Sequence, residues 1–580
     1  MTTSPAPRSG GSPVYLVVIC LVAALGGLLF GFDTAVISGA EPLFTAEFRL
    51  DPDMEGFVTS AAIIGCFFGA LAAGVLADRF GRKKVLLLSA VLFVVSAVWC
   101  WTCQTAWELV WARLVGGLGI GIASLTSPLY IAEVSPPRSR GRLVALQQMA
   151  IVLGILGAFF SNTLVNGAGL TDAAKWRWMF LVAVFPAGLF AALIFQVPES
   201  PRWLTKQGLK DKAHAILARV AGEQAAEVEM AQIVESIAHE GGSMAELLMP
   251  GLRRALWIGV VLAILTQVTG INAIMYYAPK VFTAAGFGAA AAYWCSVAVG
   301  VTNLIFTLFS MSVVDKLGRK PLLLIGAGCM GVALCGVGYS FFTSSLFTER
   351  DLKALPALAS RLQGAADPVS AYLRTQFSPD TQKVLAEYQM ADPNAKKSRS
   401  EAKRLSPALI NELNKILRSS TFFSAERFSA GALPADARIL LQQKPESAQL
   451  ARLNRLLLEA AYPTALRVKD HHRGINGWEL LVGVLAYVAS FAFSMGVVGW
   501  VVISEIYPTR TRGRAMSVAT AGVWGACYLV SVTFPSLLAG IGSAMTFWTY
   551  GLMCAVAIVF VWTCVPETKG KSLEEIEKQW

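Results

Sequence analysis

The chain has 580 residues, of which 55% are hydrophobic and only 15% are charged, and it carries a formal net charge of +11. Its mean hydropathy is +0.55, which is far too apolar for a soluble protein of this length. The composition therefore excludes a soluble protein and indicates a polytopic membrane protein.

A helix needs about 20 apolar residues to cross the hydrocarbon core of a bilayer. Twelve stretches of the sequence meet this requirement, so we expect an all-α membrane protein with twelve transmembrane helices. They lie at residues 14–38, 56–77, 84–104, 107–134, 141–165, 176–196, 254–283, 290–314, 321–342, 477–504, 514–540 and 544–565.

Charge sets the expected orientation. The basic clusters at 79–84, 138–142, 316–320 and 510–514 all fall on one side if the twelve helices alternate. By the positive-inside rule that side is cytoplasmic, so both termini are expected there in a protein of the cell membrane. The polar residues 1–13 lack the pattern of a removable signal peptide and are predicted to be a cytoplasmic tail.

Two charged side chains lie away from helix ends, Asp33 in the first predicted helix and Arg113 in the fourth. A charge inside hydrocarbon costs about 2.5 to 3.5 kcal/mol, which makes each a functional candidate. Counting residues from the extracytoplasmic ends places both at similar depth, so they are expected to pair. The pair is either a proton switch, released when Asp33 is protonated, or a static ion pair between two helices.

The chain contains an internal repeat. The segment 74–83 (GVLADRFGRK) recurs at 312–320 (SVVDKLGRK), and Glu133-Val-Ser-Pro136 recurs as Glu505-Ile-Tyr-Pro508. The repeat predicts two halves of six helices each, residues 14–196 and then 251–342 with 476–565.

Charged residues of these motifs cluster at the cytoplasmic helix ends in two equivalent sets. We interpret them as latches between the inner faces and not as substrate ligands. The sets are Asp78, Arg79, Arg82, Glu133 and Arg142 in the first half, and Asp315, Arg319, Glu505 and Arg514 in the second.

Two polar segments interrupt the helices. Residues 197–250 are expected to be a cytoplasmic helical linker, and residues 343–475 an extracytoplasmic helical insertion. The insertion is either a solvated spacer or a domain for an unknown partner. Its His471-His472 pair has no third ligand in view, so no metal site is expected. Residues 566–580 are expected to form a second cytoplasmic tail.

The motifs together resemble the sugar porter branch of the major facilitator superfamily. They are GxxxDRxGRK at 74–83, RLVGG at 113–117, PESPRWL at 198–204 and PETKG at 566–570. The resemblance implies two six-helix bundles that expose a central sugar site alternately to each side of the membrane. It also implies sugar ligands at Gln148, Gln267, Asn272, Asn303, Trp500 and Trp524, and an outer gate at Tyr276 and Tyr277.

The sequence departs from the family pattern at three places, one of which is Ala183 on the sixth predicted helix, where a proton-coupled member has a carboxylate. Thr266 precedes Gln267 where many members have a second Gln, and Gly496-Val-Val-Gly499 stands where helix ten usually has Gly-Pro. We expect helix ten to break at these glycines. Asp33 stands where the family's uniporters carry Asn and its proton-coupled members carry Asp, which favours proton symport.

We therefore predict a symporter that moves a monosaccharide and a proton across the lipid bilayer. The alternatives are a proton-independent facilitator of the same fold and a sugar sensor that uses residues 343–475. The sequence shows no phosphate-binding glycine loop, nucleophile motif or metal-ligand cluster. We expect no enzyme activity, no cofactor, no metal and no nucleic-acid partner.

Overall fold

The computed structural model describes residues 11–137, 139–238, 247, 249, 252–285, 287–343, 477–507 and 511–569. Nearly all of the predicted insertion, 344–475, lies outside these residues, as do most of both predicted tails. Met1–Val281, Ala292–Gly338 and Leu481–Trp580 belong to one compact unit, and Phe282–Ala291 with Tyr339–Leu480 to another.

The described residues contain twelve helices that are long and apolar enough to cross a membrane, which confirms the predicted all-α fold. In the first half they are α1 (Pro13–Phe48), α2 (Pro52–Phe80), α3 (Arg82–Thr102), α4 (Ala106–Val134), α5 (Arg140–Asn166) and the pair α6 (Asp172–Leu181) and α7 (Val184–Ile194). Three short helices follow, α8 (Pro201–Lys206), α9 (Lys210–Ala221) and α10 (Glu223–Ala238).

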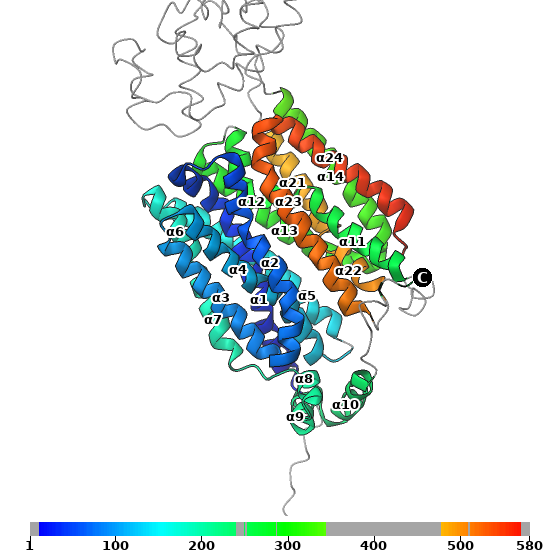
Figure 1. Ribbon diagram of the computed structural model, residues 1–580. Coiled ribbons are helices and arrows are strands. Elements are labelled where there is room, and N and C mark those ends of the chain that lie inside the picture. The colour runs from blue at the N-terminus through cyan, green and yellow to red at the C-terminus, as the bar shows by residue number, and fades with distance from the viewer. Residues whose placement is uncertain are drawn as a thin grey trace, which may run out of the picture. The chain divides into compact units, whose positions relative to one another are not determined.

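The second half has six further spans, two of which are broken. They are α11 (Leu252–Val268) with α12 (Ile271–Ala284), α13 (Ala289–Leu317), α14 (Arg319–Thr343), α21 (Gly477–Phe493) with α22 (Val498–Glu505), α23 (Arg512–Gly540) and α24 (Gly542–Cys564). In Figure 1 the blue-to-cyan helices α1–α7 group together, as do the green-to-red helices of the second half. We call these groups the first and second bundle.

Each bundle has two ends, which we call the inner end and the outer end. The inner end carries α8–α10, and the outer end carries the turn between α1 and α2 (Figure 1). The first helix is longer than the sequence predicted, since it continues to Phe48 instead of ending near residue 38. Its last turns therefore bring polar residues such as Glu41 into the packed interior.

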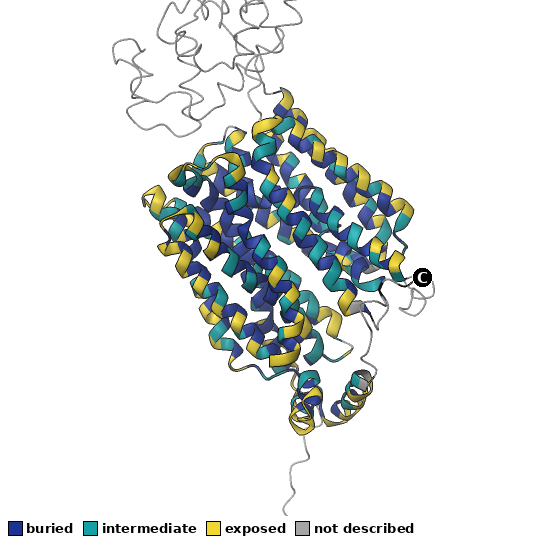
Figure 2. Cartoon of the chain, in the orientation of Figure 1, coloured by how far each residue is buried: buried dark blue, intermediate teal, exposed yellow. Residues whose placement is uncertain are grey.

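Small residues let the helices of the first bundle approach closely. On α2 and α4, a Cβ added to Gly65 would lie 2.2 Å from the backbone oxygen of Leu114, and one added to Gly117 would lie 1.9 Å from that of Ala62. Close glycine-mediated packing is a common way to hold helices together in a membrane, where no hydrophobic force joins them. The packed faces form the dark interior of each bundle in Figure 2.

The broken helices place irregular backbone inside the membrane. Between α11 and α12 the chain turns at Gly270, whose φ of 96° favours glycine. Between α21 and α22 it turns at residues 494–497, which include Gly496, while Gly499 stays helical. The break in helix ten thus occurs at one of the two glycines expected to produce it.

Candidate functional site

Asp33 and Arg113 meet in the first bundle. Arg113 Nη1 lies 2.7 Å from Asp33 Oδ1, and its Nη2 donates to the backbone oxygen of Asp33 at 3.3 Å. Both residues are almost completely buried, at 6% and 2% exposure. The two helices that carry them are α1 and α4, as the depth count predicted.

The ion pair is incompletely satisfied. The guanidinium of Arg113 also lies 5.2 Å from the ring centre of Phe180 on α6, a distance at which cation–π attraction contributes. Among the described residues, however, Asp33 Oδ2 and Arg113 Nε have no hydrogen-bond partner. The pair therefore leaves one buried acceptor and one buried donor without a bond in the described structure.

Two of the predicted sugar ligands contact each other. Asn272 Nδ2 donates a hydrogen bond to Gln267 Oε1 across the break between α11 and α12. Gln267 Nε2 in turn donates to the hydroxyl of Thr266 at 3.1 Å. Thr266, which replaces an expected Gln, thus serves as the acceptor for its neighbour. One hydrogen bond thus joins the two amides, and the Thr266 hydroxyl accepts from the second.

The other predicted ligands differ in burial. Asn303 on α13 and Trp524 on α23 are buried, Gln148 on α5 is half-buried, and Trp500 on α22 is 37% exposed. Trp524 lies 5.6 Å from Phe30 of α1, measured between ring centres, so it touches the first bundle near the depth of Asp33. Its indole N–H is buried and has no partner in the described part of the chain.

Gln147 is a residue that the sequence reasoning missed. It is buried beside Gly27 of α1, and neither its amide oxygen nor its amide nitrogen has a partner among the described residues. Only its neighbour Gln148 was identified, because the family motif points to that position. The doubled Gln147-Gln148 was the signal in the sequence that both amides deserved consideration.

The two predicted gate tyrosines are buried in the second bundle. Tyr277 donates to the backbone oxygen of Ser531 at 3.0 Å, and its φ and ψ of −121° and 21° kink α12. Tyr276 lies 3.9 Å from the sulfur of Cys527. Both tyrosines therefore tie α12 to α23.

At the inner end of the first bundle, Arg82 binds Glu133 through two bonds. Its Nε and Nη2 each lie 2.8 Å from a different oxygen of the Glu133 carboxylate. Arg82 Nη1 reaches Asp78 at 3.2 Å, and the Ser200 hydroxyl donates to Glu133 at 2.5 Å. Glu199 accepts from the backbone N–H of Arg82 at 2.9 Å. We call this set the first inner network.

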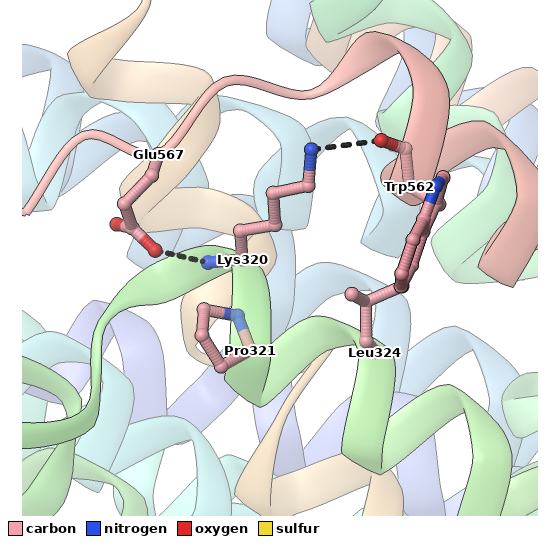
Figure 3. A pocket seen from close by; sticks show the side chains of 5 residues that line it. All are labelled: Lys320, Pro321, Leu324, Trp562 and Glu567. Carbon is pink, nitrogen blue, oxygen red and sulfur yellow. Dashed lines mark hydrogen bonds between the residues drawn. The ribbon is translucent and has the colours of Figure 1, made fainter.

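The second bundle repeats this arrangement. Arg319 binds Glu505 at 3.0 and 3.3 Å, and the Thr568 hydroxyl donates to Glu505 at 2.6 Å. Glu567 accepts from the backbone N–H groups of Arg319 and Lys320 at 3.1 and 3.0 Å. This second inner network borders a hollow of about 460 Å³, lined by Lys320, Pro321, Leu324, Trp562 and Glu567 (Figure 3).

Glu567 lies beyond the last membrane helix. Burial raises the pKa of its carboxyl, but hydrogen bonds from neighbouring backbone amides outweigh burial and lower that pKa below its ordinary value.

Each inner network lies within one bundle, whereas the sequence interpretation was a latch between the bundles. In this conformation they tie helix ends to the segments that follow α7 and α24. Arg79 stacks on Phe80 at 5.3 Å, and Arg142 and Arg514 are exposed near the starts of α5 and α23. The side chain of Asp315 lies outside the described residues, so its predicted role remains a prediction.

Residues 19–355 and 460–580 match the model of the family described as "Sugar (and other) transporter". The chain belongs to this sugar transporter family. The internal segment left out of the match, 356–459, falls inside the predicted insertion.

Full-length relatives extend this finding. The sugar transporter is 33% identical to an arabinose-proton symporter of Bacillus subtilis, covering 98% of this chain and 95% of the relative. It is 32% identical to a D-xylose-proton symporter of Escherichia coli, and the alignment covers 98% of this chain and 96% of that relative. A solved inward-open structure of the E. coli xylose transporter aligns with a TM-score of 0.66 at 30% identity, covering 97% of this chain and all of that one.

The two bundles of this sugar transporter meet at the outer end. Tyr293 of α13 donates to the backbone oxygen of Gly39 at 2.6 Å, and Ser536 of α23 donates to Asp53 of α2. Gly56 packs against the backbone of Val532. At the inner end, the ion pairs of the described residues stay within a bundle or reach α10. The outer end is therefore closed in this conformation.

Proposed function

We propose that this protein imports a monosaccharide together with a proton by alternating access, with Asp33 as the proton site and Arg113 as its coupled partner. The buried, incompletely satisfied Asp33–Arg113 pair is the observation that carries the proposal. Relatives named as proton symporters of arabinose and xylose match the chain over nearly its full length and support it. The basic loops favour an inner end that faces the cytoplasm.

The proposed cycle follows from the charges. With the outer end open, Asp33 takes a proton from outside and loses most of its attraction for Arg113. Helices α1 and α4 then lose their strongest polar contact and can rearrange. When the inner end opens, the proton leaves toward the cytoplasm and the ion pair forms again. A carboxylate thereby links proton movement to the conformation of the bundle.

We also propose that the sugar binds to Gln148, Gln267, Asn272, Asn303, Trp500 and Trp524. Amide groups both donate and accept, so each can satisfy neighbouring sugar hydroxyls, and the indole rings cover the apolar C–H faces. A hydrogen bond joins the amides of Asn272 and Gln267, and a bound sugar hydroxyl would replace it. Tyr276 and Tyr277 are proposed to gate this site from the outer end.

The test uses proteoliposomes and compares Asp33→Asn with Asn272→Ala. Asp33→Asn should abolish accumulation driven by a proton gradient, while exchange of sugar across the membrane without a gradient survives. Asn272→Ala should keep coupling but raise the sugar concentration for half-maximal exchange by about tenfold, as expected for a lost hydrogen bond to a sugar hydroxyl. Radiolabelled arabinose, xylose and glucose are the probes.

Asp172→Asn is the matched control, because this exposed carboxylate pairs only with Lys175 on its own helix in the described structure. It should leave both assays unchanged. Accumulation that persists in Asp33→Asn would overturn the coupling proposal and favour a facilitator in which the ion pair is structural. Absence of transport with every sugar, in intact wild-type protein, would favour a sensor.

A further inference from the structure

A second group of charges, two buried carboxylates and a half-buried lysine, lies at the outer end, away from the Asp33–Arg113 pair. Lys280 Nζ lies 3.4 Å from Glu41 Oε1 and forms a closer ion pair with Glu55. Glu41 and Glu55 are only 1% and 4% exposed. We call Glu41, Glu55 and Lys280 the outer triad.

The outer triad joins the two bundles. Glu41 is on α1 and Glu55 on α2 in the first bundle, whereas Lys280 is on α12 in the second. Glu41 follows Asp33 by eight residues, so it lies about 12 Å farther along α1 toward the outer end. Among the described residues, the outer triad contains the ion pairs that connect the two bundles. Opening the outer end must therefore separate Lys280 from its partners.

The charges of the outer triad do not balance. Two ionised carboxylates and one ammonium leave a net charge of −1 in a buried place, and Lys280 is the only cation of the described chain that pairs with either carboxylate. The hydroxyl of Thr45 donates to Glu41 Oε1 at 3.4 Å, but Glu41 Oε2 has no partner among the described residues.

The remaining polar groups around the triad are neutral near pH 7. Tyr277 of α12 and Tyr293 of α13 interact electrostatically with Glu41, and Lys280 Nζ lies 5.9 Å from the ring centre of Tyr277. From α23, Ser531 and Phe534 face Tyr277. None of these groups supplies a second positive charge, and a proton shared by the carboxyl groups would neutralise the triad.

We propose that the outer triad is a latch that holds the outer end closed, and that closing it takes up one proton from the outer side. When the end opens, Glu41 and Glu55 become hydrated, lose Lys280 and release the proton to the side from which it came. The triad therefore makes the conformation depend on outer pH without adding to the protons transported. This inference goes beyond the proposed symport, because it does not require Asp33 to bind a proton.

The test measures opening of the outer end directly. Spin labels are placed at Gln104→Cys, between α3 and α4, and at Ala539→Cys near the end of α23, both exposed. The more accessible native cysteines Cys329, Cys335 and Cys564 are replaced by alanine. Pulsed electron spin resonance on the full chain in lipid nanodiscs then gives the distribution of distances between the labels from pH 5 to pH 8.

All variants carry Asp33→Asn, so titration of Asp33 does not contribute and failure of the symport proposal remains a separate result. With the triad intact, the fraction of molecules with short distances between the labels should increase as the pH falls. Glu41→Gln balances the remaining charges, so the closed fraction should become independent of pH. Lys280→Met leaves two buried carboxylates without a cation, so the ratio of closed to open molecules should fall about tenfold at pH 8 and recover toward pH 5.

Glu47→Gln is the matched control. Glu47 is also a carboxylate near the outer end of α1, but its partners Arg177 and Trp176 belong to the same bundle. This variant should keep the pH response of the intact triad. An unchanged distribution in Lys280→Met would overturn the latch, and an unchanged pH response in Glu41→Gln would overturn the proton uptake.

Discussion

The inner networks and the Asp33–Arg113 pair use the same kinds of side chain but differ in how completely those side chains are satisfied. In the first inner network, both oxygens of Glu133 bind Arg82 and one also accepts from Ser200. The second network repeats these contacts with Arg319, Glu505 and Thr568. The Asp33–Arg113 pair leaves one oxygen and one nitrogen without a partner in the described structure.

This difference agrees with the proposed switching role of Asp33 and contrasts it with a structural use of charge in the inner networks. A fully bonded network holds its segments in one arrangement, and losing any member leaves another buried group unpaired. A partly bonded ion pair keeps room for a proton and can change partners. The inner networks thus fit a role in stabilising each bundle, whereas the Asp33–Arg113 pair fits a role in switching.

Removing the cation from the Asp33–Arg113 pair should have the largest effect on stability. Arg113→Met leaves Asp33 as a buried carboxylate without a counter-ion, and breaking a buried pair in this way costs about 3 to 5 kcal/mol. Thermal unfolding of the purified protein at pH 8 should show a lower midpoint.

The double variant Asp33→Asn with Arg113→Met is the control, because it removes both charges together. It should unfold at a higher temperature than Arg113→Met alone. If the single and the double variant unfold at the same temperature, an unpaired Asp33 costs no stability, and the argument that Arg113 compensates a buried charge is wrong.

Breaking the two inner networks in parallel should give smaller and unequal effects. The Glu133 and Arg82 side chains are 6% and 7% exposed, whereas those of Glu505 and Arg319 are 24% and 13% exposed. Glu133→Gln should therefore destabilise the protein by about 3 kcal/mol, and Glu505→Gln by about 1 kcal/mol because water screens the second pair. Unfolding midpoints measured side by side check the order, and a larger loss in Glu505→Gln would contradict it.

Much of the fold follows from the sequence because hydrophobic length and internal repetition are local signals. The twelve apolar stretches, the repeat of Arg82 as Arg319 and the equal depth of Asp33 and Arg113 can all be counted along the chain. The arrangement of the inner networks cannot be counted in this way. Their members lie at helix ends, and only the folded structure shows that they join segments of the same bundle.

The outer triad escaped the sequence reasoning for a physical reason. Glu41 lies beyond residue 38, where the first apolar stretch of the sequence ends, and therefore falls outside the predicted first helix. In the structure α1 continues to Phe48, and Glu41 is buried by helices of both bundles. Its partner Lys280 is 239 residues away in sequence, so no local pattern connects them. The roles of the sugar ligands likewise depend on a bound sugar and remain predictions.

The smallest effect is expected at Glu567, where the bonds are made to backbone amides at the edge of the second inner network. Because these bonds lower the pKa of Glu567, its ionised form stabilises the folded state above the ordinary carboxyl pKa, and this contribution is lost as the pH falls through the lowered value. Glu567→Gln should reduce stability by less than about 1 kcal/mol at pH 7, because the group is partly exposed. Unfolding midpoints of wild type and variant should converge at strongly acidic pH. A difference that stays constant from pH 7 to pH 3 would show that Glu567 contributes through packing and not through its charge.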